Sequence, residues 1–283
     1  MLKFLLKEVN YLNILYCGDA NMENGILLST LSLISCTEEE LCVYILTAGM
    51  TQEKKFPISK DFENKLTKTL KRKNENSYAS VIDISEMFFK NIPQANIKTR
   101  FTPFCMLRLF ADEVKKIPDR ILYLDTDVLC RKDFVDFYNK NMADCDICGA
   151  LDRYGKYFFK KSPFKFNYIN SGVLLINMKR VRENKTFLKC RELCKNKKMF
   201  MPDQSALNKI CEKNIISRIY NEQGDPNDKT VFQHFSTRFL FFPYIRTRTV
   251  KPWETERVKN VLKINDYNKL FESYEKEKEN YEK

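Results

Sequence analysis

Two aspartates set two residues apart carry the strongest chemical signal in the sequence. Asp125 and Asp127 follow the apolar run Ile121–Leu124, and the chain continues apolar through Val128 and Leu129. Burying two carboxylates this close together costs several kcal/mol unless another charge compensates them. A hard divalent cation can do so, because it prefers carboxylate oxygens and can keep coordination positions open for a diphosphate. The pair therefore predicts a metal site at the end of a strand, with a solvated acidic turn as the alternative.

A third ligand for such a cation is His234, the single histidine of the chain. It lies among aromatic residues in Val231–Phe235, and a histidine in that setting is commonly a core or surface residue without a ligand. Imidazole suits Mn²⁺, and two carboxylates with one imidazole leave coordination positions for two phosphate oxygens. If the two aspartates bind a metal, we therefore expect His234 to complete the site.

The segments that must position these residues alternate between strand-like and helix-like patterns. A strand over Tyr11–Cys17, a helix over Ile26–Ser35 and a strand over Leu41–Thr47 form a βαβ unit, which implies parallel strands. Further helices are predicted over Lys54–Ser77, Phe104–Val114 and Pro202–Lys213, and further strands over Ala79–Ile84, Cys145–Leu151 and Tyr168–Met178. The tail Asp266–Lys283 predicts a peripheral helix or a frayed end. We expect one open α/β domain with a C-terminal extension.

Polar residues follow or close several of the predicted strands. In open α/β sheets, ligands bind beyond the carboxyl ends of the strands. The residues in such positions are Asp19, Asp125, Asp127, Asp152 and Asn177. The chain has neither a glycine-rich dinucleotide fingerprint after the first strand nor a P-loop. If a nucleotide binds at this edge, a metal and basic side chains must hold its phosphates.

The composition limits which partners and which cellular compartment the sequence predicts. The 283 residues are 43% hydrophobic, so the chain can bury a substantial core, and 49 Lys and Arg against 37 Asp and Glu give a net charge of +12. That balance favours nucleotides, nucleic acid or an acidic membrane surface, although a solvated basic surface would produce it as well. No apolar run approaches the ~18 residues that cross a bilayer, and the start has no signal-peptide pattern. We expect a cytoplasmic protein, with peripheral contact at the inner face of an anionic membrane as an alternative.

The ten cysteines are scattered through apolar segments, as small buried hydrophobes are. Cys145-x-x-Cys148 offers the alternative of zinc or redox chemistry, but no second pair follows at zinc-finger spacing. The cysteines therefore do not replace the aspartates and the histidine as the expected metal site.

Five motifs agree in type and in order along the chain. They are Leu124–Leu129, Asn170–Asn177, Asp203–Asn208, His234-Phe235 and Lys251-Pro252-Trp253. In this order they resemble glycosyltransferase family 8, and the chain looks like a bacterial member, similar to lipopolysaccharide galactosyl- and glucosyltransferases. The resemblance runs from about Asn13 to Trp253. It implies a GT-A fold over residues 1–253, with a single mixed and mostly parallel sheet flanked by helices, and a helical extension over 254–283.

The resemblance also implies an activity and a role for each matching residue. Family members transfer a hexose with retention of configuration, here glucose or galactose from UDP-glucose or UDP-galactose to a glycan or glycolipid of the cell surface. The implied cofactor is Mn²⁺, with Mg²⁺ as an alternative, and no nucleic acid is involved. The matched metal ligands are Asp125, Asp127 and His234. The residues matched to the UDP moiety are Cys17, Asp19, Asn21, Arg108, Asp125 and Lys251, and those around the donor sugar are Asp152, Asn170, Asp203 and Gln204.

These residue types suit the chemistry of glycosyl transfer. A divalent cation and Lys251 would stabilise the charge left on UDP, while carboxylate and amide oxygens lower the energy of the oxocarbenium-like sugar. Gln204 is a poor nucleophile, so we expect same-face attack with its amide oxygen facing the anomeric carbon. Asp152 is the more plausible nucleophile if a double displacement operates.

Each assignment has a structural alternative. Asp19 can cap the helix that follows it, Asp203 can be a first-turn carboxylate, and Arg108 can extend from an apolar helix toward solvent. Asn170 and Asn177 can satisfy backbone groups beside a core strand. For the whole chain, the alternatives are a non-catalytic sugar-nucleotide- or glycan-binding protein and a nucleic-acid-binding module, the latter suggested only by the charge.

The segment Ser236–Val250 departs from the family pattern. Family members commonly place a glycine soon after the histidine and reach Lys-Pro-Trp within a few residues, whereas this segment is longer and has no glycine. Arg246 or Arg248 can replace a phosphate contact, because a guanidinium matches phosphate geometry. Alternatively, its aromatic residues contact the acceptor or an anionic lipid surface, which is the interpretation we favour.

Overall fold

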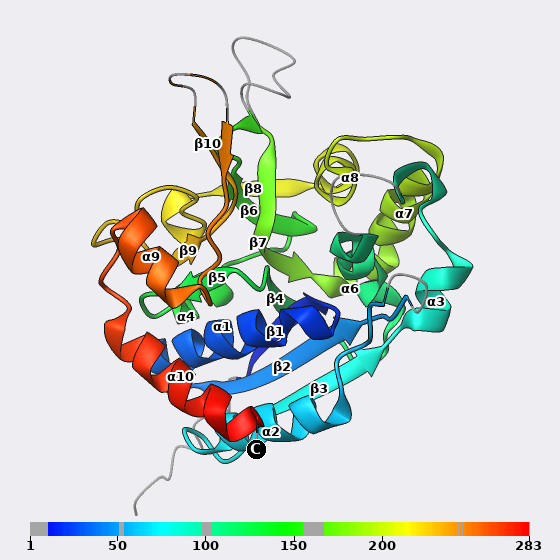
Figure 1. Cartoon of the computed structure of the whole chain (residues 1–283). Helices are drawn as coiled ribbons and strands as arrows, with labels where there is room; N and C mark the ends of the chain where they lie inside the picture. The colour runs from blue at the N-terminus through cyan, green and yellow to red at the C-terminus, as the bar shows by residue number, and fades with distance from the viewer. Residues whose placement is uncertain are drawn as a thin grey trace, which may run out of the picture.

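A seven-stranded mixed sheet forms the centre of the computed structural model, which describes residues 11–50, 54–97, 103–155, 167–240, 242, 244 and 246–282 (Figure 1). The strand order is β3-β2-β1-β4-β7-β6-β8. The strands are β1 (Tyr11–Gly18), β2 (Glu40–Thr47), β3 (Tyr78–Asp83), β4 (Arg120–Leu124), β6 (Ile147–Leu151), β7 (Ile169–Asn177) and β8 (Lys213–Ile216). Strands β1 to β4 run parallel, β7 is antiparallel to both β4 and β6, and β8 is parallel to β6. The predicted mixed, mostly parallel α/β sheet is confirmed.

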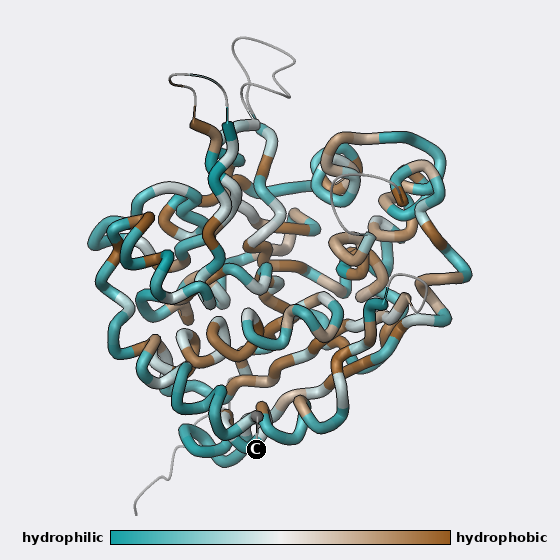
Figure 2. The backbone as a smooth tube through the Cα atoms, viewed as in Figure 1, coloured by the Kyte–Doolittle hydropathy of each residue, from teal (hydrophilic) through white to brown (hydrophobic). Residues whose placement is uncertain are grey.

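Both faces of the sheet are covered, because successive side chains of a strand point to opposite faces. On β1, Leu12, Ile14 and Tyr16 enter one core, while Leu15 and Cys17 enter the other. Figure 2 shows the consequence as apolar strands in the interior and hydrophilic helix surfaces outside.

One face carries α1 (Glu23–Cys36), α2 (Lys60–Lys71), α9 (Thr255–Leu262) and α10 (Asn268–Glu282), each of which contributes buried side chains to the first core. The other carries α3 (Ser85–Lys90), the 3-10 helix η4 (Pro103–Glu113), α6 (Met178–Glu183), α7 (Thr186–Asn196) and α8 (Pro202–Ile210). Short helices η1 (Ala20–Met22), η3 (Gln94–Asn96), α4 (Val135–Tyr138) and η5 (Arg218–Tyr220) lie between these elements.

Two small sheets complete the edge where the parallel strands end. Strand β5 (Val128–Cys130) pairs antiparallel with β9 (Phe232–His234), and the register sets Val128 opposite His234. Strands β10 (Arg238–Leu240) and β11 (Arg246–Arg248) form a second antiparallel pair, which projects from the body of the molecule in Figure 1. The β5–β9 pair therefore brings residues about a hundred positions apart in sequence to the same edge.

The predicted βαβ unit is confirmed, and the structure corrects three predicted helices. The segment Phe104–Val114 forms a 3-10 helix instead of an α-helix. The helix predicted over Lys54–Ser77 begins only after Ser59, whose side chain accepts a hydrogen bond from Phe62 N. Helix α8 ends at Ile210 rather than at Lys213, because Cys211 is extended and leads the chain into β8.

The C-terminal residues form an ordered helix that shares the core of the sheet. Phe271 and Tyr274 of α10 are buried in the same core as α1, and the two helices lie side by side (Figure 1). Tyr267, just before α10, donates a hydrogen bond from its hydroxyl to Gln233 Oε1 on β9 at 2.6 Å. Among the described helices, none has the length and apolar character that a membrane span requires.

Candidate active site

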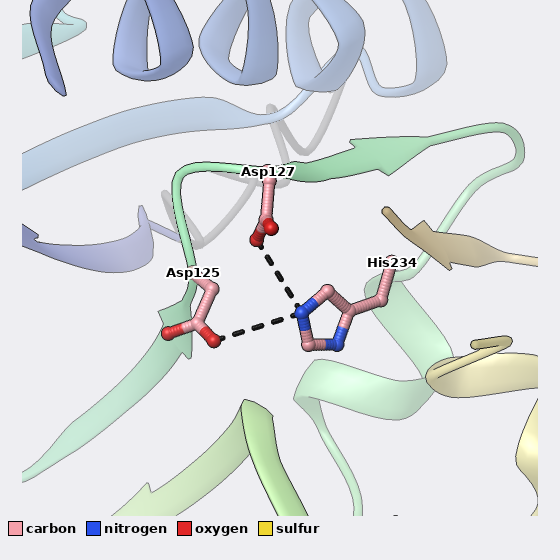
Figure 3. A group of neighbouring side chains, drawn as sticks. All are labelled: Asp125, Asp127 and His234. Carbon is pink, nitrogen blue, oxygen red and sulfur yellow. Dashed lines mark ion pairs between the residues drawn. The ribbon is translucent and has the colours of Figure 1, made fainter. Parts of the chain in front are cut away.

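Three side chains at the ends of three strands point toward one another beyond the carboxyl end of β4 (Figure 3). Asp125 follows β4, Asp127 precedes β5, and His234 closes β9. Asp125 N donates to Gly172 O of β7 at 2.8 Å, and Phe235 N donates to Asp127 O at 2.9 Å. Backbone pairing thus brings together the aspartates and the histidine that the sequence predicts as one site.

The geometry of this cluster fits a divalent cation. His234 Nε2 lies 3.3 Å from Asp127 Oδ1 and 3.7 Å from Asp125 Oδ2, and all three ligand atoms lie within 4.8 Å of one another. Two carboxylates and one imidazole are the donors expected for Mn²⁺. Within the residues that the structure describes, this is the one group of three acidic, histidine or cysteine side chains that could hold a metal ion. Cys145 and Cys148 lie 3.6 Å apart through their sulfur atoms but are not joined by such a third ligand.

Without a metal ion, positive side chains balance the buried carboxylates. Lys251 Nζ donates to Asp127 Oδ2 at 2.5 Å. Burial alone would raise the pKa of Asp127, but Lys251 and His234 outweigh it and lower that pKa. Burial likewise disfavours the charged forms of His234 and Lys251, yet the nearby aspartates raise the pKa of both. The site therefore has a strong preference for positive charge beside Asp127.

Asp125 is oriented by two donors that hold one of its oxygens. Tyr123 Oη donates to Asp125 Oδ1 at 2.6 Å, and Arg108 Nη2 donates to the same oxygen at 2.9 Å. The Arg108 guanidinium also lies 4.0 Å from the centre of the Tyr123 ring. Asp125 Oδ2 is consequently the oxygen that faces His234.

Arg108 is buried and connects Asp125 and Asp203 to the neighbouring strand β7. It donates from Nη1 to Ser171 O at 2.5 Å, and its Nε lies 3.4 Å from Asp203 Oδ2. The alternative in which Arg108 extends from its helix toward solvent is wrong, because only 4% of the residue is exposed.

The residues predicted around the donor sugar form one hydrogen-bonded group. Asp152 Oδ2 accepts hydrogen bonds from Asn170 Nδ2 at 2.9 Å and from Gln204 Nε2 at 3.2 Å. Gln204 Oε1 in turn accepts from Ser171 N at 3.0 Å and from Ser171 Oγ at 3.2 Å. All of these side chains are buried, so their mutual orientation is fixed by the network.

Asp203 lies beside this group at the start of α8. Burial raises the pKa of Asp203, and the nearby Arg108 opposes that effect only in part.

A cavity of about 270 Å³ joins the cluster of Asp125, Asp127 and His234 to the hydrogen-bonded group around Asp152. It is lined by nine of the predicted residues, namely Arg108, Asp125, Asp127, Asp152, Asn170, Asp203, Gln204, His234 and Lys251. Of the residues matched to the UDP moiety, Cys17, Asp19 and Asn21 do not line it, although Cys17 lies near the end of β1 and the other two follow that strand. Asp19 accepts hydrogen bonds from the backbone N and the side-chain Nδ2 of Asn21, so it caps η1. Cys17 is buried in the core. Asn177 closes β7 and caps α6 by accepting from Arg180 N, so its structural alternative holds.

The segment Ser236–Val250, which differs from the family pattern, supplies part of the cavity wall. Ser236, Thr237 and Phe239 line the cavity, whereas Arg246 and Arg248 are not among its lining residues. Tyr154 supports the wall, since its ring lies 4.9 Å from that of Phe239 at 73° and its hydroxyl accepts a hydrogen bond from Phe239 N. The proposed replacement of a phosphate contact by either arginine finds no support in this arrangement.

Several residues of the site carried no signal in the sequence. Tyr123 lies on a buried strand whose apolar pattern hides its hydroxyl. Ser171 contributes its backbone N and O to Gln204 and Arg108, and its hydroxyl also donates to Gln204. Asn221 lies in a segment without periodicity, yet it is fully buried and its Oδ1 lies 3.1 Å from His234 Nδ1. Only the pairing of distant segments reveals these contacts.

Solved structures with the same fold are glycosyltransferases. The chain superposes on the galactosyltransferase LgtC, solved with donor and acceptor sugar analogues, with a TM-score of 0.59 and 18% identity over 79% of this chain and 86% of that one. It superposes on the glycosyltransferase GlyE of Streptococcus pneumoniae TIGR4 with a TM-score of 0.59 and 18% identity, covering 93% of this chain and 63% of that one. At these identities, the likeness establishes the GT-A fold.

Curated relatives are glycosyltransferases as well. The lipopolysaccharide 1,2-glucosyltransferase of Escherichia coli is 23% identical over 269 residues, which cover 88% of this chain and 75% of that protein. The glycosyltransferase GlyF of Streptococcus pneumoniae serotype 4 is 29% identical over 230 residues, which cover 73% of this chain and 52% of the relative. The chain thus spans about half of GlyF, and 59% of a relative from Haemophilus influenzae.

A family model decides the membership. The model of Glycosyl transferase family 8 matches residues 13–257. This range contains the acidic pair, His234 and Lys251, and it covers most of the sheet with the helices on both of its faces. The chain therefore belongs to glycosyltransferase family 8.

Proposed function

We propose that this protein is a retaining, divalent-metal-dependent hexosyltransferase that moves glucose or galactose from a UDP-sugar to a glycan or glycolipid acceptor of the cell surface. The observation that carries the proposal is the convergence of Asp125, Asp127 and His234 within 4.8 Å, beside Lys251 and a cavity lined by carboxylate and amide groups. The galactosyltransferase and the glucosyltransferase among the similar proteins support a hexose donor.

In this proposal the metal cluster and Lys251 receive the diphosphate. A bound Mn²⁺ would supply Lewis-acid stabilisation of the charge that develops on the departing UDP. Lys251, whose side chain is partly exposed, adds a cation beside the buried Asp127, where it can stabilise the same charge electrostatically. Tyr123 and Arg108 hold Asp125 in place before the donor arrives, so little reorganisation accompanies the reaction.

The sugar group would stabilise positive charge on the transferred hexose. The Asp152 carboxylate carries the negative charge closest to Asn170 and Gln204, and its orientation is fixed by both amides. We propose same-face attack by the acceptor, in which the Asp152 carboxylate and the Gln204 amide oxygen face the oxocarbenium-like sugar. Trapping a glycosyl adduct on either residue by mass spectrometry would overturn the same-face version.

A lipid-linked acceptor is supported by the β10–β11 pair. Phe242 and Tyr244 are 88% and 64% exposed, and the Arg246 guanidinium lies 5.8 Å from the centre of the Tyr244 ring. Exposed aromatic side chains with arginine suit the interface of an anionic membrane. We propose that this pair contacts the membrane that carries the acceptor, while Phe239 faces the cavity.

The test is donor cleavage measured as release of UDP. The protein is incubated with UDP-glucose and with UDP-galactose, each with and without Mn²⁺, and compared with Asp127→Asn. The proposal predicts release from one donor that requires Mn²⁺ and falls at least about a hundredfold in the variant. Binding of UDP-sugar without any release, in the presence of a glycan acceptor, would instead favour a non-catalytic sugar-nucleotide-binding protein.

A further inference from the structure

A buried chain of amide side chains connects the metal cluster to the carboxylate at the sugar site. Asn221 Nδ2 donates to Asn170 Oδ1 at 2.9 Å, and Asn170 Nδ2 donates to Asp152 Oδ2 at 2.9 Å. At its other end, Asn221 Oδ1 lies 3.1 Å from His234 Nδ1. Asn221 is fully buried, and it is the member of this chain that contacts the imidazole.

The direction of every hydrogen bond in the chain follows from one backbone donor. Gly172 N can only donate, and it donates to Asn170 Oδ1 at 2.9 Å. The amide nitrogen of Asn170 must then face Asp152 Oδ2, to which it donates. Because Asn170 presents an oxygen to Asn221, Asn221 must present its nitrogen in return. Its oxygen is left to face His234 Nδ1, which must carry a proton.

This assignment determines what the histidine offers to a cation. With the proton on Nδ1, the neutral imidazole directs the lone pair of Nε2 toward the two aspartates. Metal-binding histidines are generally oriented by such a hydrogen bond from their other nitrogen. Asn221 therefore selects the tautomer that can bind a metal.

The backbone holds Asn221 in register with the histidine. Asn221 N donates to Arg218 O, and Gln223 Nε2 donates to Asn221 O. On the next residue, Glu222 N donates to Phe232 O while His234 N donates to Glu222 O, both at 2.9 Å. The two backbone hydrogen bonds of Glu222 thus fix the segment beside β9, next to the imidazole contact.

We propose that Asn221 is a positioning residue that fixes the metal-binding tautomer of His234 and the orientation of Asn170, and so couples the metal site to Asp152. This inference rests on the proposed function and goes beyond it, because it assigns a specific role to a residue outside the metal ligands. Substitutions at this position should therefore separate the contact of Asn221 with His234 from its hydrogen bond to Asn170.

The test begins with Mn²⁺ affinity, measured by electron paramagnetic resonance as free Mn²⁺ in a titration. Asn221→Leu removes both hydrogen bonds while keeping a side chain of similar size, and we expect a 10- to 100-fold loss of Mn²⁺ affinity. Asn221→Asp keeps an acceptor for His234 Nδ1 but cannot donate to Asn170. We expect it to bind Mn²⁺ at least as tightly as the wild type, while UDP-sugar turnover falls about tenfold or more through kcat.

A matched control lies at the far end of β1. Asn13 donates to Arg120 O and to Tyr138 Oη, so Asn13→Leu also breaks two side-chain hydrogen bonds of an asparagine. It lies away from the metal cluster, and we expect unchanged Mn²⁺ affinity. Equal affinity in wild type and Asn221→Leu, or equal losses in Asn221→Leu and Asn221→Asp, would overturn the proposal. If Asn221→Leu does not fold, Asn221→Asp decides alone, because a tenfold loss of its Mn²⁺ affinity or an unchanged turnover contradicts the coupling.

A spectroscopic readout tests the tautomer directly. The chain has one histidine, so a long-range ¹H–¹⁵N spectrum contains one imidazole. With diamagnetic Zn²⁺ in the site, we expect a slowly exchanging proton on Nδ1 in the wild type and its loss in Asn221→Leu. A proton on Nε2 in the wild type would overturn the assignment. If the wild type binds no Mn²⁺, the proposed function fails together with this inference, whereas a Mn²⁺-dependent enzyme unaffected by Asn221→Leu overturns the inference alone.

Discussion

Gly172 lies directly against the imidazole of His234. A Cβ atom on Gly172 would come within 2.2 Å of His234 Cε1 and within 2.9 Å of Asp125 Oδ2. Contacts this short cannot exist, so any larger residue at 172 must displace the ring or the carboxylate. Position 172 on β7 must therefore lack a side chain if Asp125 and His234 are to converge, which explains a glycine inside this buried strand.

The first prediction concerns this contact. Gly172→Ala should weaken Mn²⁺ binding by about tenfold or more, because the imidazole and the carboxylate can no longer converge on one ion. Calorimetric titration with Mn²⁺ measures the change. Gly149→Ala, on the neighbouring strand, is the matched control, since its Cβ would meet only the side chains of Leu174 and Ile169. Loss of stability without loss of affinity is expected for the control, and the same behaviour in Gly172→Ala would contradict the account.

Lys251 and Asp127 should have opposite effects on metal binding. The Lys251 ammonium occupies Asp127 Oδ2 at 2.5 Å and so competes with a cation for that oxygen. Lys251→Met should bind Mn²⁺ about tenfold more tightly in the absence of nucleotide, a change of ~1.4 kcal/mol, and should bind UDP more weakly. Asp127→Asn should lose affinity for both ligands. Calorimetric titrations with Mn²⁺ and with UDP measure these affinities. Weaker Mn²⁺ binding by Lys251→Met would show that the lysine orients Asp127 rather than competing for it.

Asp203 should make folding stability depend on pH. Burial raises the pKa of Asp203 despite Arg108, so ionising this carboxyl costs more in the folded protein than in the unfolded chain. The penalty is absent below the ordinary aspartate pKa of about 4 and complete above the raised value. Asp203→Asn should therefore gain stability relative to the wild type as the pH rises above about 4. Urea unfolding at several pH values measures this difference, and an offset that does not change with pH would argue against the buried charge.

The C-terminal helix should contribute to the site through Tyr267. This residue donates to Gln233, the neighbour of His234, and α10 places Phe271 and Tyr274 in the core. Ending the chain after residue 263 should lower the melting temperature by several degrees at least, because large apolar side chains leave the core. Tyr267→Phe, which removes only the hydroxyl, should lower it by much less. A truncated protein as stable as the full chain would support residues 254–283 as an independent extension.

Sequence alone could predict the sheet because its strands are continuous apolar runs at the spacing of a βαβ fold. Strand β8 (Lys213–Ile216) could not be predicted, because it is short and partly exposed. Its place in the sheet depends on pairing with β6. The convergence of Asp125, Asp127 and His234 could be predicted because few other residues of the chain offer ligands of these types beside a strand end. Asn221 could not, since an asparagine without periodicity acquires its role only when residues 221–223 pair with β9.

The central claim is that Asp125, Asp127 and His234 together hold one divalent cation at the diphosphate of the donor. Anomalous diffraction at the manganese edge, from crystals grown with Mn²⁺ and UDP, tests it most directly. The account predicts one strong peak within coordination distance of all three side chains and of the UDP phosphates. A peak elsewhere, or UDP bound in the cavity with the three side chains free of manganese, would contradict it.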